Sequence, residues 1–396
     1  MLPVTTDEAA RRAPLAIRNA KLYPSPDAPA IENASLLVRD GRIVALGAGI
    51  AIPPGARVIP GEGRFVTAGF WNAHVHFTEA KWRAARRTSA SVLSAQLTDM
   101  LTSRGFTTVV DTGSDSRSTL PLRRRIESGE LAGPRILTSG PGIFPPRGIP
   151  YYLEGSLPFW IRPFVPTPSR PAAAERIVKR NIARGADLLK LFTGSYIARG
   201  TVKTMPEPIA RAAALVAHLQ GQLVYSHPSN LEGTRVAVAS GVDVLAHPPD
   251  TTEGVERSLL KEMVDRRMAM IPTLKMFAST VTSSSGYLEP IYDIVHQFHE
   301  LGGQLLFGTD VGFMADYTTE DEFRALARSG MDARGILRSL TTAPSQRFGG
   351  GSTAGTLAVG ETADLTILDE DPMEEVAAFS RVRATVRSGR VIYLGS

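Results

Sequence analysis

The sequence predicts an α/β protein that combines a TIM (β/α)8 barrel with a small β-sandwich domain formed from both chain ends. Apolar strand-like segments alternate with helical segments through the middle of the 396-residue chain, which is typical of parallel barrels. Short strands separated by turn residues occur at the two ends instead. These observations predict a composite β-sandwich domain of residues 1–68 and 352–396 around a barrel domain of residues 69–351.

The two chain ends have the same character. Near the N-terminus, strands are predicted at residues 15–22, 34–39 and 42–46, with proline and glycine turns between them. Near the C-terminus, strands are predicted at residues 356–359, 363–368 and 383–392. Neither set can bury an apolar face alone, so we expect the two sets to pair.

The middle of the chain contains the barrel elements. Eight strands are predicted: the stretch before His74, then residues 106–111, 135–139, 187–192, 223–227, 242–247, 268–273 and 305–310. Helices are predicted between them, for example over residues 172–184, where Gly185 ends the helix, and over residues 209–219.

Composition narrows the classes of function. The chain has no cysteine, which excludes disulfides and thiolate metal ligands. Its net charge of +5 is scattered, and the arginine run at residues 123–125 reads as a solvated helix face, so we expect no nucleic-acid partner. No apolar run approaches the ~18 residues of a membrane span, so we expect no membrane partner. The N-terminus as given lacks a secretion signal, which indicates a cytoplasmic protein, or a periplasmic or secreted one if a leader was removed.

Six polar residues stand at or near the ends of predicted strands, where barrel enzymes carry their catalytic groups. They are His74, His76, Lys190, His227, His247 and Asp310. Residues two apart on a strand share a face, so the imidazoles of His74 and His76 point the same way. Converging histidine and carboxylate groups favour a divalent-metal site over hydrogen-bonded structural histidines.

Lys190 lies within the apolar segment Leu188–Phe192, where an ammonium group is costly. One interpretation is a neutral amine that reacts with carbon dioxide, which gives a carboxylated lysine able to bridge two metal ions. The other is an ordinary lysine paired with Asp310 or another acid. Residue chemistry alone leaves both open.

The motifs together resemble the amidohydrolase superfamily, in the branch of imidazolonepropionase-like proteins and Xaa-Pro dipeptidases. The matching segments are TAGFWNAHVH at 67–76, GADLLKLF at 185–192, SGVDVLAH at 240–247, FGTD at 307–310 and GETADLTIL at 360–368. The resemblance implies two divalent metal ions, zinc by default. It implies that His74, His76, Asp310 and a carboxylated Lys190 hold the buried ion, and that His227, His247 and Lys190 hold the outer one.

The implied reaction is hydrolysis of an amide bond by metal-activated water, with Asp310 as the group that moves the proton. Tyr225 shares a face with His227 and is predicted either to stabilise the oxyanion or to pack in the core. Alternative functions on the same fold are hydrolysis of a cyclic amide or lactone, deamination, or a non-catalytic scaffold.

The substrate prediction depends on a long loop over residues 140–168, which is rich in proline and aromatic residues. Predicted substrate-binding residues are Arg147, Tyr151, Tyr152, Trp160, Arg162 and Ser229. Ser229 stands where relatives often have a second histidine, and the Gly-Gly-His turn of those relatives is absent. Aromatic groups and arginine favour a small molecule, an N-acyl amino acid or dipeptide with a bulky or aromatic part. The resemblance also implies ochratoxin-like amides, because relatives in this branch include hydrolases of N-acyl aromatic amino acids. The alternative is a loop that packs on the barrel rim or on a partner in a homo-oligomer.

Overall fold

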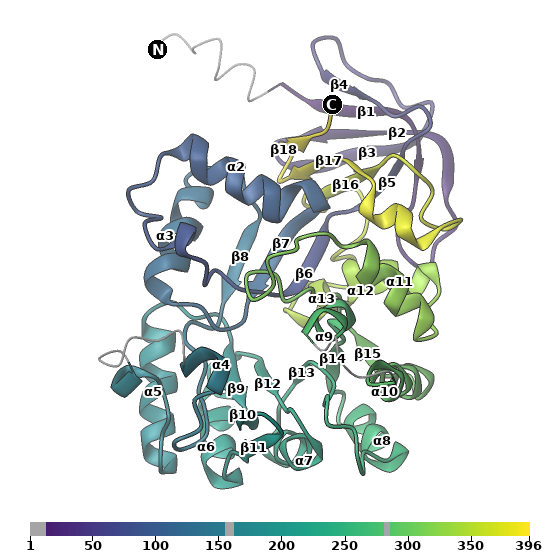
Figure 1. Cartoon of the computed structure of the whole chain (residues 1–396). Helices are drawn as coiled ribbons and strands as arrows, with labels where there is room; N and C mark the ends of the chain where they lie inside the picture. Colours follow the sequence, from purple (N-terminus) through teal and green to yellow (C-terminus); the bar gives the residue numbers. More distant parts are fainter. Residues whose placement is uncertain (1–12, 155–161, 281–285) are drawn as a thin grey trace.

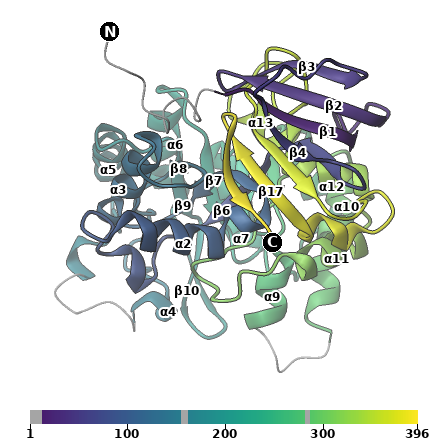
Figure 2. The same cartoon turned by 90° about the horizontal axis from the view of Figure 1, so that it is seen from above.

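The computed structural model of the chain describes residues 13–154, 162–280 and 286–396. Its central strands are parallel and follow the predicted order: β6 (Phe70–Val75), β7 (Phe106–Asp111), β8 (Arg135–Thr138), β9 (Leu189–Phe192), β12 (Val224–His227), β13 (Val244–Ala246), β14 (Ala269–Ile271) and β15 (Gln304–Leu305). Figures 1 and 2 show these strands in the middle of the molecule with helices packed around them.

The central strands form two sheets, one of three strands in the order β6-β7-β8 and one of five in the order β15-β14-β13-β12-β9. Isolated parallel bridges join the sheet edges, from Ile143 to Leu191 and from Val75 to Val311. The α/β architecture is therefore confirmed, whereas the predicted closed barrel is not present as one continuous ladder. β15 is only two residues long, and Asp310, at the end of the strand predicted there, has a left-handed φ of 59°.

Helices follow most of the central strands. Their bounds are α2 (Ala90–Met100), α3 (Ser116–Glu127), α4 (Tyr151–Glu154), α5 (Pro171–Ala183), α6 (Glu207–His218), α7 (Leu231–Ser240), α8 (Arg257–Asp265), α9 (Leu274–Thr280), α10 (Leu288–Glu300), α11 (Glu320–Arg328), α12 (Ala333–Leu340) and α13 (Thr342–Arg347). A short hairpin of β10 (Gly194–Ala198) and β11 (Thr201–Thr204) follows β9. The predicted helix over residues 172–184 corresponds to α5, and Gly185 takes the left-handed φ of 99° that ends it.

The chain ends contribute strands to one mixed sheet of eight strands. These are β1 (Leu15–Leu22), β2 (Ile31–Arg39), β3 (Arg42–Ala48), β4 (Arg57–Pro60), β5 (Phe65–Ala68), β16 (Leu365–Leu368), β17 (Val382–Arg387) and β18 (Arg390–Leu394). The antiparallel pair β5–β16 joins the two ends, as expected.

The structure of this sheet differs from two predictions for the chain ends. A sandwich of two packed layers is not confirmed, because the strands belong to a single hydrogen-bonded sheet. The predicted strand over residues 356–359 is wrong, because these residues are irregular, and the Leu357 N–H donates to Pro24 O at 2.7 Å. The domain boundaries at residues 68 and 352 stay a prediction.

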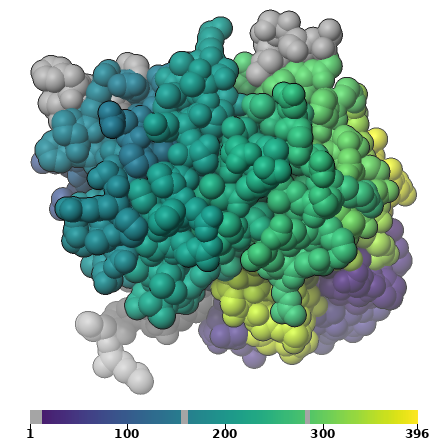
Figure 3. Space-filling view, turned by 90° about the horizontal axis from the view of Figure 1, so that it is seen from below, coloured from purple at the N-terminus to yellow at the C-terminus, as the bar shows by residue number. Residues whose placement is uncertain are grey.

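Separate apolar clusters fill the molecule. One lies within the terminal sheet and includes Ile17, Leu36 and Ile367, and another includes Trp71, Val110 and Tyr225 from the central strands. Figure 3 shows a face made by the teal and green middle of the chain, with the purple and yellow chain ends along one edge. None of the described helices has the length and apolar character needed to cross a membrane.

Candidate metal centre

β6 carries the first two histidines of the site. Its six residues are all buried, and His74 is 1% exposed. His76 follows the strand, and its N–H donates to Val311 O at 2.8 Å, so the residue after β6 is tied to the loop after β15. The predicted pair of histidines therefore lies at one end of a rigid strand, where that loop crosses it.

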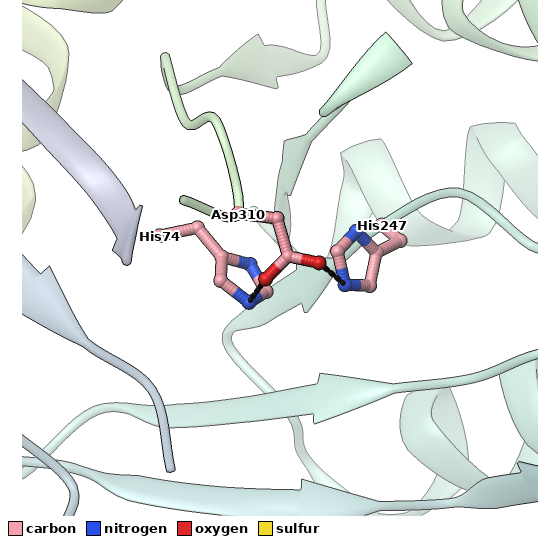
Figure 4. A group of neighbouring side chains, drawn as sticks. All are labelled: His74, His247 and Asp310. Atoms are coloured by element: carbon pink, nitrogen blue, oxygen red, sulfur yellow. Dashed lines mark ion pairs between the residues drawn. The ribbon is translucent and has the colours of Figure 1, made fainter. Parts of the chain in front are cut away.

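Asp310 lies between the histidines. Its Oδ1 is 3.2 Å from His74 Nε2 and 2.9 Å from His76 Nε2, and its Oδ2 is 3.9 Å from His247 Nε2. Figure 4 shows the carboxylate between the rings of His74 and His247. The Asp310 N–H donates to His74 O at 2.9 Å, which holds the left-handed backbone of Asp310 against β6.

His247 directly follows β13, and its ring centroid is 4.5 Å from that of His74. His247 Nδ1 is hydrogen-bonded to Thr273 Oγ1, and the Thr273 hydroxyl donates to Pro272 O at 2.8 Å. Because a hydroxyl has a single hydrogen, Thr273 accepts from the His247 Nδ1–H. Nε2 then carries the lone pair and faces Asp310, as a metal ligand requires.

His227 and Lys190 complete the group. His227 ends β12, and its ring centroid is 4.9 Å from that of His247 and 5.1 Å from that of Phe192. Lys190 Nζ is 5.4 Å from the centre of the Phe192 ring, and Lys190 is 1% exposed. No described carboxylate lies within 4.0 Å of Lys190 Nζ, so the direct ion pair with Asp310 that the sequence left open is not observed.

The electrostatics of the site favour metal-binding protonation states. Burial, and after it the Lys190 charge, lower the pKa values of His74 and His227 to about 3. Burial and His74 hold the pKa of His247 well below its usual range. Burial lowers the pKa of Lys190 to about 7. Burial opposes ionisation of Asp310, but the neighbouring histidines outweigh it and hold its pKa well below the ordinary value. Neutral imidazoles and an ionised carboxylate are the forms that bind metals.

Buried polar atoms at this point lack hydrogen bonds. Nδ1 and Nε2 of His74 and Oδ1 of Asp310 make none with any residue that the structure describes, although His74 Nε2 and Asp310 Oδ1 are close. Ligand atoms of His74, His247 and Asp310 all lie within 4.8 Å of one another. Unpaired buried polar groups are costly, and a shared cation would satisfy them. The donor set fits a divalent metal ion such as zinc.

Asn72 is a supporting residue that the sequence analysis missed. Its Oδ1 accepts from the N–H groups of His74 and Thr309, each at 3.2 Å, and its Nδ2 donates to Thr309 Oγ1 at 2.6 Å. One amide therefore fixes the strand of His74 to the segment that carries Asp310. The sequence signal for this residue was an amide side chain within an apolar strand, two residues before His74. Thr273 gave no such signal, because it is 26 residues from the histidine it orients.

Tyr152 is a predicted substrate residue whose pKa responds to the charge of Asp310. It is half-buried, and burial followed by the charges of Asp310 and Asp250 raises its pKa. Its ring centroid is 5.6 Å from those of Tyr151 and Phe313, which are 41% and 45% exposed. Phe313, which the sequence analysis also missed, is three residues after Asp310.

The other predicted substrate residues differ in their surroundings. Arg147 is exposed and has no ion pair with a described residue. Arg162 donates to Glu154 Oε1 at 3.1 Å and to Glu154 O at 2.9 Å, so its guanidinium binds the end of α4. Ser229 is buried two residues after His227, and its Oγ has no hydrogen bond within the described part of the chain. Trp160 lies outside the described residues.

Tyr225 is fully buried, and its ring centroid is 6.3 Å from that of Phe348. Burial raises its pKa, and the charges that act on it come from Arg347 and Asp243. Asp243 directly precedes β13, at the opposite end of that strand from His247. This position favours the packing interpretation of Tyr225 over contact with an oxyanion.

Comparisons with known proteins agree with this geometry. The model of the amidohydrolase family matches residues 65–392. Ochratoxinase from Aspergillus niger is 23% identical over 417 residues, a match that covers 96% of this chain and 85% of that protein. A crystal structure of an Xaa-Pro dipeptidase with bound methionine in its active site has a TM-score of 0.81 and 21% identity, over 97% of this chain and 100% of that one. The crystal structure of A. niger ochratoxinase has a TM-score of 0.75 and 19% identity, over 96% and 95% of the two chains. The chain belongs to the amidohydrolase family and is a hydrolase that acts on carbon–nitrogen bonds.

Proposed function

We propose that the protein is a metal-dependent hydrolase that cleaves the amide bond of an N-acyl amino acid or a dipeptide, with a bulky or aromatic group on the substrate. The observation that carries the proposal is the convergence of His74, His247 and Asp310 on one point, with buried ligand atoms that lack hydrogen bonds. The similarity to ochratoxinase and to an Xaa-Pro dipeptidase supports an amide as the substrate.

We assign the ligands of two divalent ions to the six strand-end residues. His74, His76 and Asp310 would hold the buried ion, His227 and His247 the outer one, and a carboxylated Lys190 would bridge them. Bound divalent ions, zinc by default for this ligand set, supply Lewis-acid activation of water and of the scissile carbonyl. The burial of Lys190 without a carboxylate partner among the described residues supports its modification.

Asp310 is the proposed proton carrier. Its carboxylate takes a proton from the attacking water and delivers it to the leaving nitrogen, which otherwise would depart as an unstable anion. The histidines around Asp310 favour its ionised form, which is the form that accepts a proton. Asn72 and the Asp310–His74 backbone hydrogen bond keep the carboxylate in place during this transfer.

We also infer that the two central sheets act as one barrel, separate from the terminal sheet. Hydrogen bonds from Ile143 to Lys190 O at 2.9 Å and from Ala73 to Phe307 O at 2.7 Å cross the two gaps between the sheets. Such a barrel would bring the ends of β6, β9, β12 and β13 to one rim. The terminal sheet, with its own apolar cluster, supports the division near residues 68 and 352.

Metal analysis and a substrate screen test the proposal. We expect about two equivalents of metal per chain in purified, metal-loaded protein, and hydrolysis of dipeptides or N-acyl amino acids that a chelator abolishes and added zinc restores. The screen includes small lactones and cyclic amides. Protein that holds metal and opens only the cyclic substrates would contradict the proposed reaction.

The arginines of the loop can be tested separately as readers of a substrate carboxylate. Arg147→Ala or Arg162→Ala should raise KM for an acid substrate far more than for its neutral amide counterpart, if either guanidinium binds the carboxylate. Because Arg162 already binds Glu154, we expect the larger selective effect from Arg147. Equal effects on both substrates in both variants would remove the arginine–carboxylate contact.

A further inference from the structure

A carboxylate beyond the proposed metal ligands is held by two phenols. The Tyr196 hydroxyl donates to Asp250 Oδ1 at 3.0 Å, and the Tyr287 hydroxyl donates to Oδ2 at 3.3 Å. Tyr196 also contacts Thr251 Oγ1 at 2.7 Å, where it accepts because its own hydrogen is used on Asp250. Tyr196 lies on β10 and Tyr287 directly precedes α10, so two separate segments fix this one side chain.

Asp250 lacks a positive partner. The carboxylate is half-buried, and none of the described lysine, arginine or histidine side chains comes within 4.0 Å of it. Each oxygen receives one phenol hydrogen, which leaves acceptor capacity on both. Burial raises the pKa of Asp250, so the anion is held at a cost that an incoming cation would offset.

Asp250 lies on a segment that is connected to two of the proposed metal ligands. It follows the proposed ligand His247 by three residues, and the Thr251 N–H donates to Ser229 O at 3.0 Å. Ser229 is itself two residues after the proposed ligand His227. Burial, followed by the charges of Asp310 and Asp250, raises the pKa of Tyr152, so both carboxylates act on this one phenol.

We propose that Asp250, oriented by Tyr196 and Tyr287, binds the free ammonium group of a dipeptide substrate. This inference rests on the proposed function and narrows it from amides in general to dipeptides. In a dipeptide the ammonium is carried by the carbon next to the scissile carbonyl, so it must bind beside the metal centre. An N-acyl amino acid has no such cation and would leave Asp250 unpaired.

The alternative is that Asp250 only anchors the β10–β11 hairpin to the start of α10. An anchor of this kind would affect stability and would act equally on every substrate. A binding role acts on substrates according to their charge. The two roles therefore differ in substrate selectivity, which is the quantity to measure.

The experiment uses alanyl-phenylalanine and N-propanoyl-phenylalanine, which have nearly the same shape and differ in the ammonium group. The full-length, metal-loaded wild type should cleave the alanyl compound with the higher kcat/KM. Asp250→Asn keeps the size of the side chain and should lower that value about tenfold to a hundredfold, as expected for a charged hydrogen bond. Its kcat/KM for the propanoyl compound should stay nearly unchanged.

Glu253→Gln is the matched control, because Glu253 is an exposed acid on the same loop. This variant should have the wild-type kcat/KM for both substrates. Equal losses on both substrates in Asp250→Asn would overturn the ammonium site and leave amide hydrolysis standing. If Asp250→Asn does not fold, the wild-type preference decides, and equal kcat/KM values for the pair overturn the proposal.

If the wild type cleaves neither compound, the same pair serves as ligands in calorimetric titrations, while the substrate screen tests the proposed reaction separately. Tighter binding of the alanyl compound, lost in Asp250→Asn, would then support the ammonium site. Equal binding of the two compounds by the wild type would overturn it.

Discussion

Lys190 combines burial with a reactive amine. It lies on β9 between Leu189 and Leu191, and burial lowers its pKa to about 7, so much of it is neutral at physiological pH. We expect Lys190→Ala to lose the second metal ion and most of the activity, because this variant lacks the proposed bridging ligand. Added short carboxylates should restore part of the rate. Metal content and kcat of the same preparation provide the measurement.

Lys179→Ala is the control for this substitution, since Lys179 is exposed on α5. It should retain both metal ions and full activity. A crystal structure of fully active enzyme with an unmodified Lys190 and one metal ion would contradict the bridging role.

Asp310 is assigned two tasks, and Asp310→Asn separates them. The amide oxygen can still bind metal, but it does not accept a proton. We therefore expect retained metal and a rate reduced by the ~10²–10⁴ that general acid–base catalysis typically contributes. Parallel metal analysis and steady-state kinetics would check this. A loss of less than about tenfold with metal retained would leave Asp310 as a ligand only.

At the scale of elements, the turn after β15 packs closely against the segment after β6. Gly312 has a φ of 95°, and a Cβ atom there would lie 1.8 Å from His76 O. The Thr78 hydroxyl also donates to Gly312 O at 2.7 Å. We expect Gly312→Ala to separate His76 from Asp310, and so to lower both the affinity for zinc and the melting temperature.

Gly302→Ala provides the matched control, because Gly302 also has a left-handed φ, 84°, but a Cβ atom there would meet nothing within 4 Å. This variant should cost only the backbone strain of about 1–2 kcal/mol and should bind zinc as the wild type does. Similar zinc affinities for the two alanine variants would show that the close contact at Gly312 does not hold the metal ligands.

At the scale of the whole molecule, a buried acid links pH to stability. Glu322 of α11 accepts the Lys275 N–H of α9 at 2.7 Å through Oε2, while Oε1 has no hydrogen bond within the described residues. Burial raises the pKa of Glu322 to about 7. Between pH 4.5, the pKa of Glu322 in the unfolded chain, and about pH 7, its pKa in the folded protein, the folded protein binds one more proton than the unfolded chain. The protonation of Glu322 therefore contributes fully to stability below pH 4.5, and this contribution is lost as the pH rises through 7.

Glu322→Gln imitates the protonated form. We expect the melting temperature of the wild type to fall more steeply between pH 5 and pH 8 than that of the variant, with the variant the more stable at pH 8. Scanning calorimetry across this range gives the comparison. Asp321→Asn, which removes the exposed neighbouring acid, should keep the wild-type slope. If the melting temperatures of the wild type and Glu322→Gln changed with pH in parallel, Glu322 would not be the source of the pH dependence.

Sequence patterns predicted helices and strands well where neighbouring residues decide the backbone conformation. α5 begins and ends within one residue of its prediction, because Gly185 supplies the left-handed residue that ends a helix. The strand predicted over residues 305–310 corresponds to the shorter β15, and Asp310 at its predicted end has a positive φ while its N–H donates to His74 O of β6. The two central sheets likewise meet through single isolated bridges, which no periodicity of the sequence encodes.

The sequence by itself determined which residue types stand at the ends of the predicted strands. Side chains alternate along a strand and parallel strands end at one rim, so residue type and spacing predicted a metal-binding group of His74, His76, Lys190, His227, His247 and Asp310. Only the tertiary structure decided how these groups are supported: Thr273 orients His247, and Asn72 ties β6 to Thr309, next to Asp310. It also decided that Glu154 binds the guanidinium of the loop residue Arg162. Only the tertiary structure also shows that Asp250 accepts hydrogen bonds from Tyr196 and Tyr287, which lie 54 and 37 residues away in the sequence. Hydrogen bonds of this kind depend on where the folded chain brings distant residues, and no local pattern of amino acids records that.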